Sequence, residues 1–227
     1  MSTRDLGPAK ATRDRLVAAA IRLLEEGGPE AVQTRRVGAE IGASTMAVYT
    51  HFGGMKNLVV AVAREGFSRL ARVMENVPAT DDPVADMFEL ALAYRQYALE
   101  NSQLYRVMFG LSVAGGHRLA PVDVDELMGT GRYPEGREAF ALVYRGVERI
   151  IAAGDGAGGE PLTESLQLWS GAHGHVLLEF GGYFGPPEQS VHTVLVPLAE
   201  KLFAAMGHPP EAVRDSIRTV LARRGYA

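Results

Sequence analysis

The sequence predicts an all-α protein, and three observations support this fold class. Apolar residues recur at intervals of three and four, which places them on one face of a helix. Proline or a short polar residue opens many of these segments and glycine closes them, as is typical of helices. The alternating apolar and polar runs of strands are almost absent.

Composition excludes several protein classes. The chain has 227 residues, 47% of them apolar, which is enough to bury a core. No uninterrupted apolar stretch approaches the roughly 20 residues of a membrane span, and charges interrupt the N-terminal region where a secretory signal is apolar. We therefore expect a soluble, cytoplasmic protein without membrane contact. The absence of cysteine excludes disulfides, zinc–thiolate sites and thiol nucleophiles.

Charge is distributed unevenly along the chain, although the net charge is only -4. Residues 1–76 carry 11 Lys and Arg against 8 Asp and Glu, whereas residues 77–227 carry 12 against 19. A mildly basic first part on an acidic remainder suits a protein that touches phosphates at one end.

Start and stop signals for each helix follow one another along the chain. The first, residues 10–26, carries its apolar side chains on one face and stops at Gly27-Gly28-Pro29. A long helix over 57–75 ends before Pro78, and Asp82-Pro83 offers an N-cap followed by proline at the first helical position for a helix over 82–100. The remaining segments are a short helix at 103–109, a long loop at 110–133 that we expect to be disordered, and helices at 134–153, 161–180, 188–206 and 210–223.

Residues 34–52 are typical of two short helices joined by a tight turn. We expect Thr34 to cap the first helix and Ser44 the second, because short hydroxyl side chains accept from free amides at helix starts. Gly42 can take the left-handed conformation that turns the chain between them. The paired positions Val37 and Ile41, and Val48 and Phe52, form the core of the motif; Thr45, Met46, Ala47 and Thr50 face outward and are small enough to enter a DNA major groove.

The motif Thr-x-x-x-Val-x-x-x-Ile-Gly-Ala-Ser-x-x-x-Val-Tyr-x-His-Phe, with the preceding Gly-Gly-Pro-Glu-Ala-Val-Gln, resembles the signature of TetR-family transcriptional regulators. The resemblance implies an N-terminal three-helix DNA-binding domain (1–56) and a larger helical-bundle ligand-binding and dimerisation domain (57–227, with 57–76 as connecting helix). It implies backbone contacts from Thr34, Tyr49 and His51 and base-edge contacts from the outward face. The expected DNA-binding residues are Thr34, Arg35, Arg36, Ser44, Thr45, Met46, Ala47, Tyr49, Thr50, His51 and Lys56.

One position departs from the family pattern. Members commonly have lysine three residues after the motif phenylalanine, as a phosphate contact, but this chain has Met55 there and Lys56 next to it. The offset leaves that contact open and shifts phosphate binding toward Thr34, Tyr49, His51 and either Arg35 or Arg36.

The C-terminal part contains Trp169-Ser-Gly-Ala-His173-Gly174, which resembles a Trp…His-Gly hallmark of one subgroup of TetR ligand domains. The family implies a homodimer through the helices near 161–180 and 188–206, and an effector cavity among the helices of 82–180. The candidate ligand-binding residues are Tyr105, Met108, Phe109, Phe140, Tyr144, Trp169 and His173. Aromatic residues at helical spacing are equally compatible with plain core packing.

Other sites are less well supported by the sequence, and we expect no cofactor and no metal. His173 and His175 lie about 200 degrees apart around a helix, so they cannot chelate one ion. The acidic loop residues Asp123, Asp125 and Glu126 can bind a cation or simply be solvated. The glycines from 154 to 159 follow a helix and not a strand, which excludes a phosphate loop.

The predicted function is a non-enzymatic, ligand-responsive regulator: a repressor that a small molecule releases from a palindromic operator in double-stranded DNA. Two alternatives remain. One is an enzyme using the region of Trp169 and His173, which a His–carboxylate pair within hydrogen-bond reach would support. The other is a ligand-binding or scaffold protein with a vestigial DNA-binding head.

Overall fold

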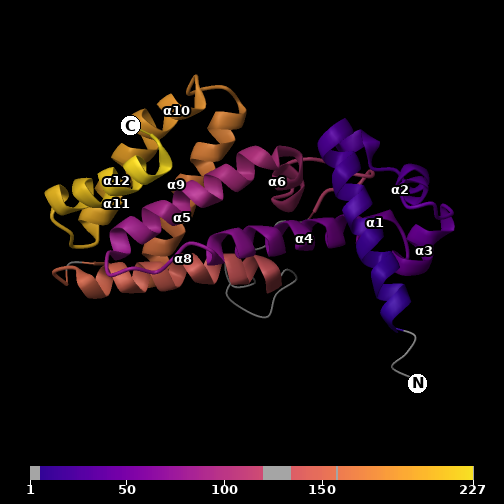
Figure 1. The fold of residues 1–227 in the computed structure, drawn as a ribbon, viewed down its shortest axis with the longest axis horizontal. Helices are drawn as coiled ribbons and strands as arrows, with labels where there is room; N and C mark the ends of the chain where they lie inside the picture. Colours follow the sequence, from indigo (N-terminus) through magenta and orange to yellow (C-terminus); the bar gives the residue numbers. More distant parts are fainter. Residues whose placement is uncertain (1–5, 120–133, 157, 227) are drawn as a thin grey trace. The chain divides into compact units, whose positions relative to one another are not determined.

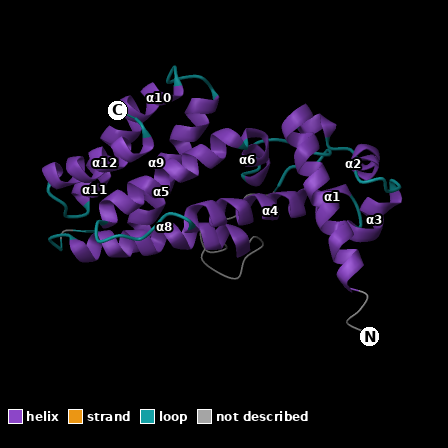
Figure 2. Cartoon of the chain, viewed as in Figure 1, coloured by secondary structure: helices purple, strands orange, loops and turns teal. Residues whose placement is uncertain are grey.

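The structure is a computed structural model, and it describes residues 6–119, 134–156 and 158–226. These residues form helices and connecting turns, with no strand among them (Figures 1 and 2). The all-α prediction is therefore confirmed. The elements are α1 (Leu6–Gly27), η1 (Pro29–Ala31), α2 (Thr34–Glu40), α3 (Met46–Phe52), α4 (Met55–Glu75), α5 (Pro83–Glu100), α6 (Ser102–Met108), α8 (Pro134–Ala153), α9 (Pro161–Phe180), α10 (Pro187–Ser190), η2 (Val191–Leu195), α11 (Val196–Ala205) and α12 (Pro210–Arg224).

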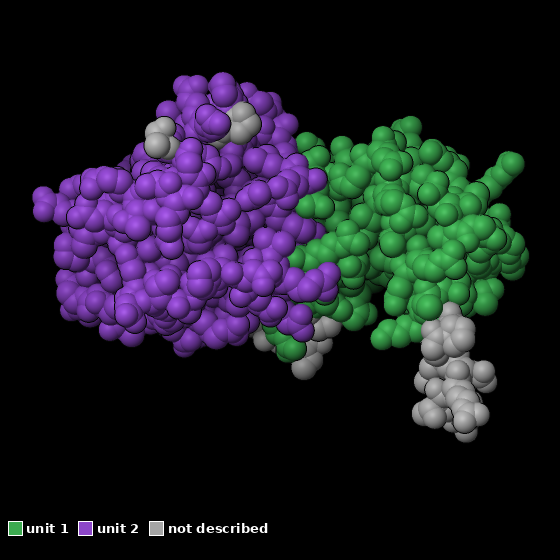
Figure 3. Space-filling model, viewed as in Figure 1, with its two compact units in different colours: residues 1–69, 101–137 green, residues 70–100, 138–227 purple. Residues whose placement is uncertain are grey.

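The chain forms two compact units, coloured separately in Figure 3. The first comprises residues 1–69 and 101–137, and the second comprises residues 70–100 and 138–227. The division differs from the expected domain boundary after residue 56, because it falls within α4 and assigns α6 to the first unit. No helix in the described part of the chain is long and apolar enough to cross a membrane.

The first unit is built around α1. Its expected apolar face is buried, including Leu16 and Leu24, and α1 contacts η1, α2, α3 and α6. A carboxylate oxygen of Glu25 on α1 accepts the backbone N–H of Leu104 at 2.7 Å. This bond satisfies one of the amides that are left without an intrahelical partner at the start of α6.

The second unit is centred on α5, which is buried around most of its circumference and contacts α9 and α12. Asp82 accepts the N–H of Ala85 at 2.9 Å, so the predicted N-cap of this helix is confirmed.

The single helix predicted over 188–206 is wrong in one respect. Near its start, η2 is a π-helical turn in which the N–H of Val196 donates to the carbonyl of Val191, five residues earlier. Pro197 explains the wider turn, because its ring has no N–H and crowds the carbonyl four residues before it in an α-helix.

Part of the predicted loop at 110–133 is ordered. Ala114 and His117 exchange two backbone hydrogen bonds of 3.0 and 2.9 Å, which close a tight turn. The expectation of disorder is therefore wrong for this turn. Residues 120–133, including the acidic cluster Asp123, Asp125 and Glu126, lie outside the described residues.

Candidate DNA-reading surface and ligand pocket

The turn between α2 and α3 depends on two glycines. Gly42 has a φ of +70°, the left-handed conformation predicted for it. The N–H of Ala43 then donates to the carbonyl of Gly38 at 2.9 Å. A Cβ atom on Gly38 would lie 2.9 Å from the carbonyl oxygen of Ser44, so the turn packs directly on the α2 backbone. The relative placement of the two helices therefore depends on a position without a side chain.

The predicted side-chain caps of these helices are wrong. Thr34 is the first residue of α2, and the cap position is Gln33, whose carbonyl accepts the N–H of Val37 at 2.9 Å. Helix α3 begins at Met46, and the N–H of Ala47 bonds to the backbone carbonyl of Ser44 at 2.9 Å, with no side-chain cap bond. Backbone carbonyls therefore start both helices, and neither hydroxyl is used in capping.

Helix α3 has two distinct faces. Val48 is 0% exposed and Phe52 is 5% exposed, whereas Met46 is 63% and Tyr49 50% exposed. The hydroxyl of Thr50 donates to the carbonyl of Met46 at 3.0 Å. The exposed face, which also includes Thr45, is thus uncharged.

Helix α1 contacts both helices of the motif at residues 34–52. The guanidinium of Arg15 donates to the carbonyl of Ile41 at 3.0 Å, where α2 ends. The guanidinium of Arg13 lies 4.7 Å from the centre of the Phe52 ring, within the range of a cation–π contact. The C-terminal end of each of the two helices is therefore in contact with α1.

The cationic candidates occupy helix starts. Arg35 and Arg36 are exposed in the first turn of α2, and Lys56 is exposed in the first turn of α4. Met55 is packed differently: a Cβ atom on Gly115 would lie 2.4 Å from Cγ of Met55, so its side chain covers the turn at 110–119. Packing therefore occupies the position at which the family has lysine, and Lys56 provides the nearby charge.

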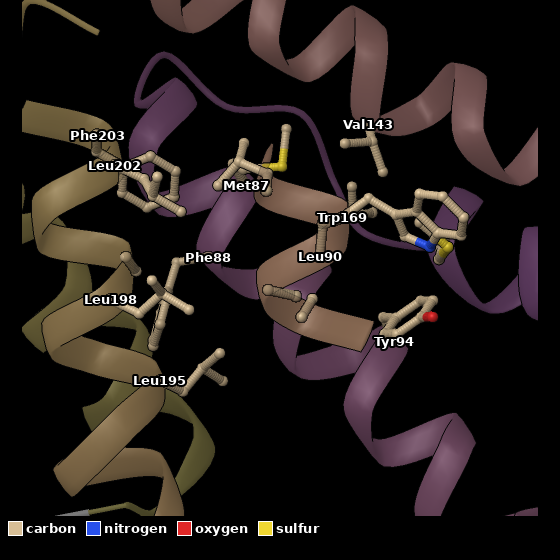
Figure 4. A pocket seen from close by; sticks show the side chains of 15 residues that line it. Met87, Phe88, Leu90, Tyr94, Val143, Trp169, Leu195, Leu198, Leu202 and Phe203 are labelled. Atoms are coloured by element: carbon tan, nitrogen blue, oxygen red, sulfur yellow. The ribbon is translucent and has the colours of Figure 1, made fainter. Parts of the chain in front are cut away.

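The second unit contains an apolar pocket between α5, α8, α9 and α11, shown in Figure 4. About 540 Å³ of space lies among its lining side chains, a volume that includes the open solvent at its mouth. The lining contains no charged side chain. Its residues are Met74, Met87, Phe88, Leu90, Ala91, Tyr94, Val143, Leu168, Trp169, Ala172, Leu195, Leu198, Ala199, Leu202 and Phe203.

Tyr94 provides the polar end of this pocket. Its hydroxyl lies 3.2 Å from Nδ1 of His173, and the His173 ring lies 5.8 Å from the Trp169 ring, centre to centre. Burial lowers the pKa of His173 below the ordinary histidine value. The His173 ring is therefore neutral near pH 7, so it places no positive charge beside the Tyr94 hydroxyl.

The predicted ligand-binding residues are divided between the two units. Trp169 lines the pocket, and Phe140 packs edge-on against it at 6.0 Å. Tyr144 is half-buried on α8 but does not line this pocket. Tyr105, Met108 and Phe109 belong to the first unit, where the Phe109 ring packs on Tyr105 at 4.7 Å and on Phe67 at 5.3 Å.

Sequence reasoning missed Tyr94 and most of the aliphatic wall as pocket residues. The signal for Tyr94 was present, because it follows Met87 by seven residues and Leu90 by four, a spacing that puts all three on one apolar face of the helix. Periodicity shows that such a face is buried but does not show which of its residues meet a cavity.

A buried polar cluster lies elsewhere in the second unit. Arg95 donates from Nε to Glu179 at 2.9 Å, and the Ser190 hydroxyl donates to the same carboxylate at 2.6 Å. His175 stacks on Phe184 at 5.2 Å, and its Nε2 lies 3.5 Å from Glu179. Burial lowers the pKa of His175, Glu179 raises it and Arg95 lowers it, with a net lowering.

This cluster contains the His–carboxylate pair that would favour an enzyme, but its geometry does not fit a catalytic triad. Ser190 and Glu179 both approach Nε2 of His175, whereas a triad needs the acid on Nδ1 and the hydroxyl on Nε2. The described residues offer Nδ1 no hydrogen-bond partner, and both His175 and Ser190 are buried. Within the described ranges, no group of three His, Asp or Glu side chains is placed to hold a metal ion.

Comparisons with known proteins point to one family. Residues 16–62 match the family described as bacterial regulatory proteins, tetR family, and residues 87–202 match the tetracyclin repressor-like C-terminal domain. An uncharacterised HTH-type transcriptional regulator of Mycobacterium tuberculosis is 24% identical over 178 residues, covering 77% of this chain and 73% of the relative.

Two solved structures share the fold. A protein of unknown function from Rhodococcus sp. RHA1 is 27% identical with a TM-score of 0.70, covering 87% of this chain and 96% of its own. RolR in complex with resorcinol is 16% identical with a TM-score of 0.60, covering 92% of this chain and 94% of its own.

Proposed function

Because this chain belongs to the TetR family of bacterial regulatory proteins, we propose that it is a repressor which a small molecule releases from a palindromic operator. Family membership makes it a ligand-responsive, DNA-binding transcriptional regulator that acts as a homodimer. The observation that carries the proposal is the face of α3. Met46 and Tyr49 are exposed while Val48 and Phe52 anchor the helix from behind.

Sequence reading would depend on the uncharged face of Thr45, Met46, Ala47 and Thr50. Their short or unbranched side chains suit close approach to base edges in a major groove about 12 Å wide. Since the Thr50 hydroxyl already donates to its own helix, this residue can offer a methyl group and lone pairs to the DNA. Apolar contact with thymine methyl groups therefore fits this surface better than bidentate guanine recognition.

Phosphate binding would come from the edges of the motif. Arg35, Arg36 and Lys56 supply exposed charge, and Tyr49 supplies an exposed hydroxyl. Thr34, Ser44 and half-buried His51 complete the proposed set. These contacts position the protein on any duplex, whereas the α3 face distinguishes sequences.

The homodimer would form through α9 and the α10–η2–α11 run. Leu178, near the end of α9, is 45% exposed, and Tyr183, directly after this helix, is 77% exposed. Large apolar side chains at such exposure favour a covered surface. A two-fold axis would place two α3 helices in successive major grooves, about 34 Å apart.

Ligand release requires that the effector bind one dimer geometry more tightly than the other. The apolar pocket of the second unit is the proposed effector site. RolR was solved with a small molecule bound, so this fold can accommodate one. We assign the protein no enzymatic role, since the acid–histidine pair is enclosed and bonded to Arg95 and Ser190. We further propose that the protein acts in the cytoplasm, where the bacterial chromosome lies.

Selection from fragmented genomic DNA tests this function. The full-length protein is mixed with the fragments, and the bound ones are sequenced. A recovered inverted repeat whose half-sites lie one helical turn apart supports the proposal, and so does weaker binding when Met46 is replaced by alanine. Recovery of fragments without a shared sequence would favour a vestigial DNA-binding head instead.

A further inference from the structure

The turn that follows α6 packs onto the DNA-binding motif. Ala114 and His117 close it with two backbone hydrogen bonds, and both glycines between them have positive φ, +56° at Gly115 and +77° at Gly116. Positive φ at both central positions is typical of the compact type I′ turn. Ala114 is buried, so the turn is seated on its neighbours and presents a tip of two glycines.

The tip of this turn meets the motif at two places. A Cβ atom on Gly115 would lie 2.4 Å from Cγ of Met55, the first residue of α4, and 3.2 Å from the carbonyl oxygen of Val32, two residues before α2 begins. A residue without a side chain allows this close approach. The turn therefore contacts the chain beside the first turns of α2 and α4, which carry the exposed cations of the motif.

A hydrogen bond extends this contact to the reading helix. The side-chain amide of Asn57, two residues after Met55, donates to the carbonyl of Phe52 at 2.7 Å, where α3 ends. Gly53 and Gly54 link α3 to α4, and glycine restricts the backbone less than any other residue. The placement of α3 relative to α4 therefore depends on contacts outside the link, such as the Asn57 bond.

Resting on the proposed DNA-binding function, we propose that the turn at residues 114–117 is a positioning element for the DNA-reading surface. It acts through Met55, which holds the start of α4 in place. Asn57 then holds the end of α3 to that start. Met55 is thus a positioning residue for sequence reading, and it acts through packing, without a DNA contact of its own.

The packing at Gly115 makes this position sensitive to added atoms. Carbon atoms in contact lie about 3.5–4.0 Å apart, so a methyl group on Gly115 would require the turn and Met55 to separate by roughly 1 Å. Rotation of the Met55 side chain relieves this clash only in part, because the Val32 oxygen belongs to the backbone. A shift of this size at the start of α4 would be transmitted through Asn57 to α3.

Gly115→Ala and Gly116→Ala form a matched pair for the test. Both variants place a side chain at positive φ and bear similar backbone strain. A Cβ atom on Gly116, however, meets nothing within 4 Å. Gly115→Ala should weaken binding to the selected operator about tenfold and Gly116→Ala less than about twofold, since binding groups tolerate misplacement of only about 0.5 Å.

Fluorescence anisotropy measures these affinities at a temperature at which circular dichroism shows all variants folded. Affinities for single-base variants of the operator are measured alongside. Gly115→Ala should also reduce the preference for the operator over these variants, because α3 is displaced. A purely structural role would lower the amount of folded protein and leave this preference unchanged, and that result would overturn the proposal.

A double-mutant cycle tests the part played by Met55. Met55→Ala should itself weaken operator binding, and adding Gly115→Ala should then cost less than it does in the parent chain, because the clashing side chain is gone. Asn57→Ala should weaken binding about three- to tenfold, the effect of one lost hydrogen bond. Equal effects of the two glycine changes, or additive effects of Gly115→Ala and Met55→Ala, would overturn the proposal.

Hydrogen exchange without DNA keeps this test separate from the proposed function. Exchange over residues 46–57 is followed by mass spectrometry in the full-length protein. We expect faster exchange in Gly115→Ala than in Gly116→Ala, because α3 is held less firmly. Equal exchange would overturn the positioning role, whatever the operator selection finds. Faster exchange in a protein that selects no operator would support the positioning of α3 and contradict the proposed function alone.

Discussion

The guanidinium of Arg15 donates to the main-chain carbonyl of Ile41 at 3.0 Å. Ile41 is the C-cap of α2, directly after its last residue, where carbonyls lack intrahelical partners and the helix dipole favours a cation. The bond therefore fixes the turn of the DNA-binding motif against α1.

Replacing Arg15 by alanine should weaken operator binding about three- to tenfold. This is the effect of losing about one hydrogen bond, here the bond that positions the DNA-binding motif. Fluorescence anisotropy with a labelled operator measures the change. Arg22→Ala is the matched control, because Arg22 approaches Glu40 only at 3.7 Å with both side chains exposed. An equal loss in the two variants would show that general charge, and not the capping bond, is responsible.

Gly38→Val should destabilise the first unit by about 1–3 kcal/mol, the usual cost of forcing extra carbons into a packed site. The new side chain would meet the carbonyls of Ser44 and Ala43, which are backbone atoms and cannot rotate away. Urea unfolding of Gly38→Val and of Ala39→Val, an exposed neighbour on the same helix, separates this clash from the helix propensity of valine. Similar midpoints for the two variants would contradict the close packing.

Tyr49→Phe should weaken binding to every DNA sequence by a similar factor, because phosphate contacts position the protein without specifying bases. Substitutions of Thr45 or Thr50 should change the preferred half-site instead. Affinities for the operator and for a set of single-base variants distinguish the two behaviours. An altered base preference in Tyr49→Phe would assign that residue to base reading.

Stability should fall as the pH decreases below about 6.5, the ordinary histidine pKa. Burial lowers the pKa of His175 and His173 in the folded state, so the unfolded chain binds protons first and is favoured in acid. For His175, nearby Glu179 opposes this lowering and Arg95 adds to it.

Urea midpoints between pH 7.5 and pH 5 measure this dependence. We expect a shallower slope for His175→Gln and a shallower one still for the double variant with His173→Gln. His192→Gln, a change at an exposed site, is the control. An unchanged slope in both histidine variants would exclude these residues as its source.

Leu178→Glu should shift the protein from dimer toward monomer. The change occurs twice at a two-fold interface, once on each copy, and places two unpaired charges there. Sedimentation velocity measures the assembly state. Leu111→Glu, on an exposed apolar residue of the first unit, should leave the dimer intact; dissociation by both variants would contradict an interface through α9.

The sequence was sufficient for most of the helices and for three of the four expected core residues of the DNA-binding motif, because both depend on local spacing; the fourth, Ile41, is half-buried. Gly42 adopts the predicted conformation, and Val48 and Phe52 are buried as expected. The predicted side-chain caps at Thr34 and Ser44 are wrong because backbone carbonyls compete with side chains for the same amide N–H groups. Residue spacing does not show which of the two acceptors an amide will use.

The ligand residues were harder to predict for a different reason. Tyr105 and Tyr94 look alike in sequence, since each is an aromatic residue on an amphipathic helix. Tyr105 is enclosed by Phe109 and other core residues, whereas Tyr94 lines a pocket. Helical periodicity shows which face of a helix is apolar. It does not show which other helix packs against that face, because this depends on the fold of the whole chain.

The π-helical turn at Val191–Leu195 has a consequence for insertions and deletions. Because it accommodates one additional residue, the faces before and after it differ in phase by about 100°, the rotation per residue of an α-helix. Ser190 thereby reaches the Glu179 carboxylate while Leu198 and Leu202 reach the pocket. Removing a single residue from this turn would rotate one of the two contacts out of place, so its length is constrained more tightly than its composition.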